Sequence, residues 1–207
     1  QTRGATGNQD FGYVAGGLSK STVDRIDYSN DTATASPKGP LSLARSNQGA
    51  SSSRANATPL KGPGVLEVSV AFGAFSAPGP VPAGTDFGYM AGGFAGSYPS
   101  PSTVVDRIDY SNDTATASAK GPLTAGASYT TGVASLTHGY TLGGRNANHV
   151  STVERIDFAN DTANSVLRGP LSQTRYRSHA ATGNKDFGYI GAGQAGGPNT
   201  VSSVERV

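Results

Sequence analysis

The stretch Ser21–Leu41, STVDRIDYSNDTATASPKGPL, decides the fold because the chain repeats it. Close copies are STVVDRIDYSNDTATASAKGPL at Ser102–Leu123 and STVERIDFANDTANSVLRGPL at Ser151–Leu171, and SSVERV at Ser202–Val207 begins a further copy. Self-similarity of this kind indicates one small structural unit that is copied and stacked. The chain is therefore predicted to be a repeat protein.

One copy reads as a series of short strands. In Thr22–Tyr28, β-branched residues are interleaved with charged ones, which favours a strand, and the Ser-Asn-Asp that follows favours a tight turn. Thr32–Ser36 reads as the next strand, which is stopped by Pro and Gly-Pro. Upstream lie an aromatic-Gly-Tyr strand, Phe11–Gly17, and a weak strand of small residues, Arg3–Asn8. Each unit is thus predicted to hold four short strands.

The order of these segments resembles kelch repeats, in which an aromatic-x-Tyr-x-x-Gly-Gly strand precedes a Val-Glu-Arg strand and a proline stop. The residues that carry the resemblance are Tyr13, Gly16-Gly17, Val23–Asp27 and Gly39–Leu41. It implies an all-β, kelch-like β-propeller with units of about fifty residues. The chain departs from the pattern at the usual Trp position, which is Ala33, Ala115 and Ala163 here. We therefore expect thin packing between blades, helped by closely approaching glycines.

The repeated text also resembles the repeat arrays of structural and tail-associated proteins of marine bacteriophages. This resemblance implies a virion or another extracellular surface as the setting. Near-identical units also favour end-to-end assembly of copies, because the edge of each blade is complementary to that of any other.

The spacing divides residues 1–207, a single repeat domain, into units at about 1–42, 43–63, 64–123, 124–171 and 172–207. The second is degenerate and the last lacks its fourth strand, so about five blades are represented, one of them incomplete. Between Leu43 and Asp86, both Ser46–Ser53 and Leu66–Phe72 fit a first strand. Closed propellers have about four to eight blades, so either a small ring closes or the chain is an arc of a larger propeller.

The composition excludes several classes of function. With a net charge of +2 and isolated basic residues, nucleic acid is not an expected partner. The chain has no cysteine, which excludes disulfides and thiolate metal sites. We find no apolar run long enough to cross a bilayer and no secretion signal at Gln1–Lys20. No membrane insertion is expected.

The loops that differ between copies are the expected binding elements, because a propeller presents such loops on its rim. Candidate contacts with a sugar or a protein are Tyr98, Arg145, Asn146, Asn148 and His149.

The turns that the copies share can be interpreted as structural elements or as sites of modification or metal binding. Asn30, Asn56, Asn112 and Asn160 fit the Asn-x-Thr acceptor for glycosylation, although Asn is also an ordinary turn residue. Asp27, Asn30 and Asp31 offer oxygens for calcium, but a hydrogen-bonded turn is favoured. The arginine of each copy, such as Arg25, is predicted to pair with an acid on an adjacent blade or strand, such as Asp27.

No catalytic motif stands out, and His138, His149 and His179 are not spaced as metal ligands. We expect a non-catalytic structural and recognition module of a virion or cell-surface appendage, without cofactor or metal. Its expected partner is a surface glycan or a neighbouring structural subunit, with self-association as a further expectation. The alternatives are an intracellular kelch-type adaptor and a non-catalytic part of a carbohydrate-active enzyme.

Overall fold

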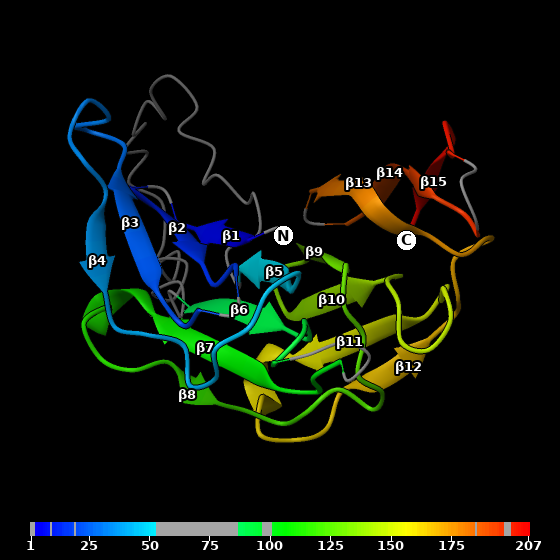
Figure 1. Ribbon diagram of the computed structural model, residues 1–207, viewed down its shortest axis with the longest axis horizontal. Helices are drawn as coiled ribbons and strands as arrows, with labels where there is room; N and C mark the ends of the chain where they lie inside the picture. The colour runs from blue at the N-terminus through cyan, green and yellow to red at the C-terminus, as the bar shows by residue number, and fades with distance from the viewer. Residues whose placement is uncertain are drawn as a thin grey trace, which may run out of the picture.

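The computed structural model describes residues 3–8, 10–18, 20–52, 87–96, 101–184, 186–196 and 200–207. They form three four-stranded antiparallel sheets and one three-stranded sheet, arranged as a four-bladed β-propeller (Figure 1). Blade 1 holds β1 (Gly4–Gly7), β2 (Phe11–Ala15), β3 (Val23–Asp27) and β4 (Ser36–Lys38). Blade 2 holds β5 (Gly49–Ser52), β6 (Phe87–Ala91), β7 (Val105–Asp109) and β8 (Ser118–Ala119). Blade 3 holds β9 (Thr131–Ala134), β10 (His138–Leu142), β11 (Val153–Asp157) and β12 (Val166–Arg168), and blade 4 holds β13 (Tyr176–Gly183), β14 (Gly188–Gln194) and β15 (Val204–Arg206).

The first strand of each blade lies nearest the centre of the molecule. β1 packs against β5, β5 against β9, and β9 against β13 (Figure 1). Within each blade the strands follow one another in chain order, so β4, β8 and β12 are the outer edges. This order confirms the predicted unit of consecutive antiparallel strands.

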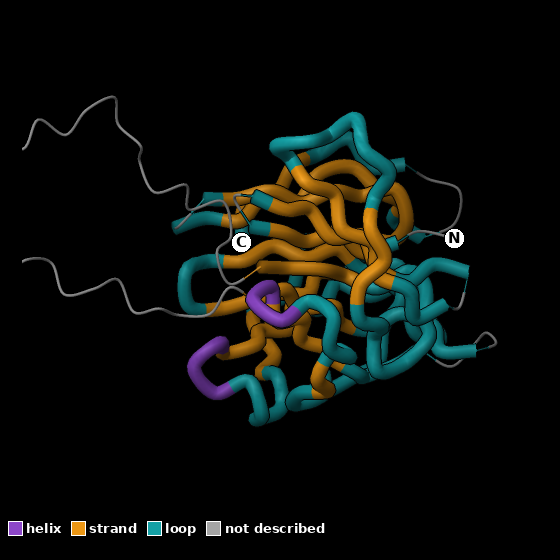
Figure 2. The backbone as a smooth tube through the Cα atoms, turned by 90° about the vertical axis from the view of Figure 1, so that its left-hand side faces the viewer, coloured by secondary structure: helices purple, strands orange, loops and turns teal. Residues whose placement is uncertain are grey.

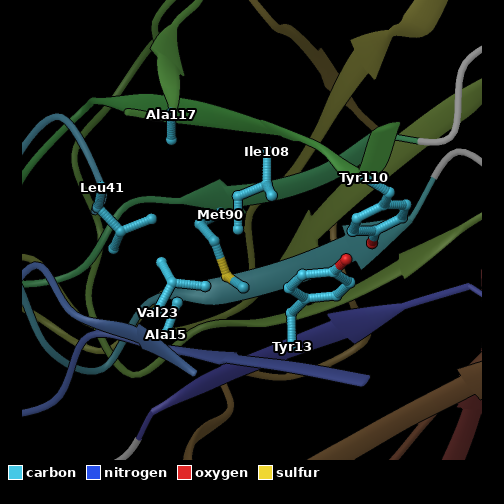
Figure 3. Close-up of a cluster of buried hydrophobic side chains, with 8 residues drawn as sticks. All are labelled: Tyr13, Ala15, Val23, Leu41, Met90, Ile108, Tyr110 and Ala117. Carbon is cyan, nitrogen blue, oxygen red and sulfur yellow. The ribbon is translucent and has the colours of Figure 1, made fainter. Parts of the chain in front are cut away.

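The core lies between blades, because the Val and Ile of the third strands β3, β7 and β11 point to opposite faces of their sheet. In blade 2, Ile108 packs with Tyr13 and Val23 of blade 1, whereas Val105 packs with residues of blade 3. Figure 3 shows the first of these clusters, in which the rings of Tyr13 and Tyr110 lie face to face. Strand β7 is therefore buried on both faces and packs against blade 1 with one face and against blade 3 with the other.

The described residues form four blades, whereas about five were expected. A strand does lie within Ser46–Ser53, as expected, but Gly49–Ser52 is the first strand of the blade that contains Phe87–Ala91 and not of a separate degenerate unit. The alternative first strand at Leu66–Phe72 and positions 53–63 of the expected degenerate unit lie outside the described residues. Blade 4 has three strands, as expected of its repeat.

The fourth strand of each unit begins later than predicted. In blade 1 it covers Ser36–Lys38, and residues 32–35 belong to the turn. In blades 2 and 3 that turn starts with a short 3-10 helix, η1 (Tyr110–Asn112) or η2 (Phe158–Asn160). Figure 2 shows both helices on the same side of the molecule. Within the described residues, no helix has the length and apolar character needed to span a membrane.

Candidate functional site

The inner strands of blades 2, 3 and 4 are entered through a residue with left-handed backbone, a conformation that L-residues rarely adopt. These residues are Asn47 (φ 58°), Tyr129 (φ 54°) and Arg177 (φ 50°). Asn tolerates this conformation, but for other L-residues it costs about 1–2 kcal/mol. Strain of this kind persists only where the surrounding structure enforces it, and it gathers at functional sites. We call the end of the molecule at which Asn47, Tyr129 and Arg177 lie the channel mouth.

The same three residues line two neighbouring cavities. The larger, of about 610 Å³, runs along the inner strands and is also lined by Arg3, Gln48, Thr130 and His179. The smaller, of about 310 Å³, is also lined by Ser46, Phe94, Gly96 and Arg145. Both volumes are in the range of small-molecule sites. The channel mouth therefore offers space for a ligand beside strained backbone.

Aromatic rings and arginines gather around Tyr129. Its ring meets Phe94 edge-on, with centroids 5.5 Å apart, and the guanidinium of Arg177 lies 4.9 Å from the ring centroid. Arg177 also lies 5.5 Å from the ring centroid of Tyr176, on which His149 stacks at 3.8 Å. These contacts join three loops and the start of strand β13 into one surface of apolar faces and cationic groups.

The charge of the channel mouth is positive. Arg3, Arg145 and Arg177 line the cavities, and no Asp or Glu occurs among their lining residues within the described chain. Burial, together with the charges of Arg145 and Arg177, lowers the pKa of His149 from its ordinary value of 6.5. Burial is also the main cause of the lowered pKa of His179. Both imidazoles are therefore neutral at pH 7, and the arginines supply the charge.

Three buried polar atoms of the larger cavity have no hydrogen-bond partner among the described residues. They are Oε1 of Gln48, Oγ1 of Thr130 and Nε2 of His179. An unsatisfied buried polar group costs about 1–3 kcal/mol. Polar atoms left in this state beside a cavity are suited to hydrogen bonding with a ligand or water.

The residues predicted to bind a partner lie in different surroundings. Arg145 lines the smaller cavity, and His149 stacks on Tyr176 beside it. Asn146 and Asn148 hold their own turn together, because the Asn148 amide donates to Oδ1 of Asn146 at 3.0 Å. Tyr98 lies outside the described residues. The structure thus brings Arg145 and His149 to the channel mouth and places the two asparagines in the adjoining turn.

Sequence reasoning missed Asn47, Tyr129, Tyr176 and Arg177. They precede or begin the weak first strand, where the copies resemble one another least. The variation between copies could have identified these residues. Equivalent positions in blades 2, 3 and 4 carry side chains of different chemistry, namely Ser46-Asn47, Ser128-Tyr129 and Tyr176-Arg177. Recognition of a specific ligand requires such different side chains at equivalent positions of the repeated scaffold.

The shared turns are hydrogen-bonded structural elements. In each of the three, Oδ1 of Asn30, Asn112 or Asn160 accepts a bond from the following threonine at 3.3 or 3.4 Å. These three asparagines are exposed, so glycosylation there stays a prediction, and Asn56 lies outside the described residues. Oδ1 of Asp27 accepts from the amide and hydroxyl of Ser29. No group of three or more described His, Asp or Glu residues could hold a metal ion.

The predicted arginine ladder connects neighbouring blades, but its acid differs from the one expected. Arg25 pairs with Asp113 at 2.8 Å and Arg107 with Asp161 at 2.8 Å. These carboxylates follow the Asn of the turn in the next blade, whereas Asp27 caps its own turn. Sequence alone could not choose between two aspartates that lie four residues apart.

The comparisons with known proteins assign no family. No protein-family model matches the chain, and no curated protein matches it. The function is therefore argued from the geometry of the channel mouth.

Proposed function

We propose that this chain is a non-catalytic recognition module that binds an acidic glycan at the channel mouth. One observation carries the proposal: Tyr129, Arg145 and Arg177 converge on a 310 Å³ pocket that no carboxylate lines within the described residues. Arginine pairs with a carboxylate through two parallel hydrogen bonds. Aromatic rings supply the apolar faces that small-ligand sites require.

The proposed site includes no chemical step. Glycoside hydrolysis ordinarily uses two carboxyl groups that flank the scissile bond, and the described lining of both cavities offers neither. The unsatisfied atoms of Gln48, Thr130 and His179 supply hydrogen bonds to sugar hydroxyls instead.

The setting that fits this proposal is a virion or cell-surface appendage built from kelch-type repeats. The support is the sequence resemblance together with the propeller architecture, which presents loops of different chemistry at one end of a rigid scaffold. In this setting the chain is extracellular and attaches its particle or cell to a surface glycan.

Titration calorimetry with oligosaccharides that do or do not carry a uronic acid tests the proposal. We expect binding of the acidic oligosaccharide, and Arg177→Gln should weaken it about tenfold or more, because hydrogen bonds to charged groups contribute about 1.5–3 kcal/mol. Arg168→Gln is the matched control, since Arg168 is exposed on the outer strand β12. Equal binding of neutral and acidic sugars, or equal losses in both variants, would contradict the proposal.

A further inference from the structure

Blades 1 and 2 are joined by a set of contacts that we call the inter-blade joint. Its centre is the carboxylate of Asp113 in blade 2. Oδ2 accepts from the Tyr13 hydroxyl at 2.9 Å and from Arg25 at 2.8 Å, and Oδ1 lies 3.3 Å from Nζ of Lys38. Each strand β2, β3 and β4 of blade 1 thus contributes one donor to a carboxylate of the next blade.

The same joint connects blades 2 and 3. Asp161 accepts from the Tyr89 hydroxyl at 3.0 Å and from Arg107 at 2.8 Å, and it lies 3.4 Å from Nζ of Lys120. An aromatic pair accompanies each joint: Tyr13 stacks on Tyr110 at 4.7 Å, and Tyr89 stacks on Phe158 at 4.9 Å. The joint is therefore a repeated recognition element with defined chemistry.

Blade 1 presents the accepting half of a joint on its outward face. Tyr28 and Asp31 are the counterparts of Tyr110 and Asp113. Tyr28 is 53% exposed, against 7% for Tyr110. Asp31 is exposed as well, and its side chain has no hydrogen-bond or ion-pair partner among the described residues.

Blade 4 presents the donating half. Tyr189 and Arg206 are the counterparts of Tyr13 and Arg25. Tyr189 is 37% exposed, whereas Tyr13 and Tyr89 are fully buried. Arg206 lies over the ring of Phe187 at 4.7 Å, much as Arg25 lies over Phe11 at 4.2 Å. The donor is thus held in the conformation that the formed joints use.

We propose that two copies of this chain associate head to tail through an intermolecular joint, in which Tyr189 and Arg206 of one copy hold Asp31 of the other. Two observations name a second copy as the occupant: the two faces have complementary charge, and the same pairing is made twice within the chain. Exposed apolar residues flank both halves, namely Ile26 beside Asp31 and Val204 beside Arg206. The contact is heterologous, so successive copies form a ring or a filament.

Sedimentation velocity over a range of concentrations tests the proposal with charge reversals. We expect the native chain to form species at multiples of 20.9 kDa. Asp31→Arg and Arg206→Asp should each lower the association constant at least tenfold, because each places like charges across the joint. Mixing the two variants should restore association, since each then meets an opposite charge on the other. Arg168→Asp, which makes the same charge change as Arg206→Asp on the exposed outer strand of blade 3, should leave association intact.

Three results would overturn the proposal. The first is a native chain that remains monomeric at every concentration. The second is a mixture of the two variants that remains as dissociated as either alone. The third is that Asp31→Arg and Arg206→Asp lower the melting temperature of a protein that is monomeric with and without them. This result would place the contact between Asp31 and Arg206 within one chain. Circular dichroism of each variant keeps loss of folding distinct from loss of association.

Discussion

Two glycines that each begin a Gly-Pro-Leu sequence allow a sharp test of how the blades are packed. Gly121 and Gly169 both precede Pro-Leu after the outer strand of their blade. The amide of Gly121 donates to the carbonyl of Asp161 in the next blade at 2.8 Å. A Cβ on Gly121 would lie 2.8 Å from the carbonyl carbon of Thr162 and closer still to the backbone oxygen of Ala163. A Cβ on Gly169 would meet nothing within 4 Å.

Gly121→Ala should therefore force blades 2 and 3 apart. Overpacking typically costs about 1–3 kcal/mol, and the loss of the Gly121 hydrogen bond adds about 1 kcal/mol. A total of about 3 kcal/mol lowers the melting temperature of a domain of this size by about 6–12 °C. Gly169→Ala should instead be neutral or raise stability by up to about 1 kcal/mol, because alanine restricts the unfolded chain.

Equilibrium unfolding in urea, followed by circular dichroism, measures both variants. The two free energies of unfolding should differ by about 3–4 kcal/mol, with unchanged spectra of the folded proteins. If Gly121→Ala and Gly169→Ala had the same stability, backbone contact between the blades at Gly121 would be refuted.

Three further perturbations have expected outcomes. Arg45→Ala should cost about 3–5 kcal/mol in urea unfolding, because it leaves Asp106, fully buried beside Arg45 at 3.1 Å, without its ion-pair partner. Burial alone would raise the pKa of Asp113, but hydrogen bonds from Tyr13 and Lys38 and the charge of Arg25 hold it below 3.8. Stability from this group is present above pH 3.8 and is lost as the pH falls through the lower folded-state pKa, so Asp113→Asn should flatten the acid limb of a pH–stability curve. Arg177→Gly should raise stability by about 1 kcal/mol through relief of left-handed strain while it weakens glycan binding about tenfold or more in calorimetry.

Much of the fold could be predicted because its signals are local. The alternation in Val23–Asp27 and its copies gives the third strand, and the Gly-Pro stop gives the end of the unit. The number of blades was predicted wrongly because β5 and β6 belong to one blade. They pair Gly49 with Ala91 across a long separation in sequence. Pairing over such a distance depends on which strand edges meet in space, and no local pattern records it.

The candidate site was only partly predictable for a similar reason. Arg145 and His149 were found because their loop differs between copies. Tyr129 and Arg177 were missed because their importance depends on a left-handed backbone and on contacts between blades, including the 4.9 Å approach of the guanidinium to the ring. Neither feature leaves a residue pattern within one repeat.

A crystal structure of the chain with a bound uronic-acid oligosaccharide tests the proposed recognition site most directly. We expect the sugar in the cavity between Phe94, Tyr129 and Arg145, with its carboxylate paired to Arg145 or Arg177. Electron density for the sugar on the opposite face of the propeller, or an empty channel mouth at saturating oligosaccharide, would contradict glycan recognition at this site.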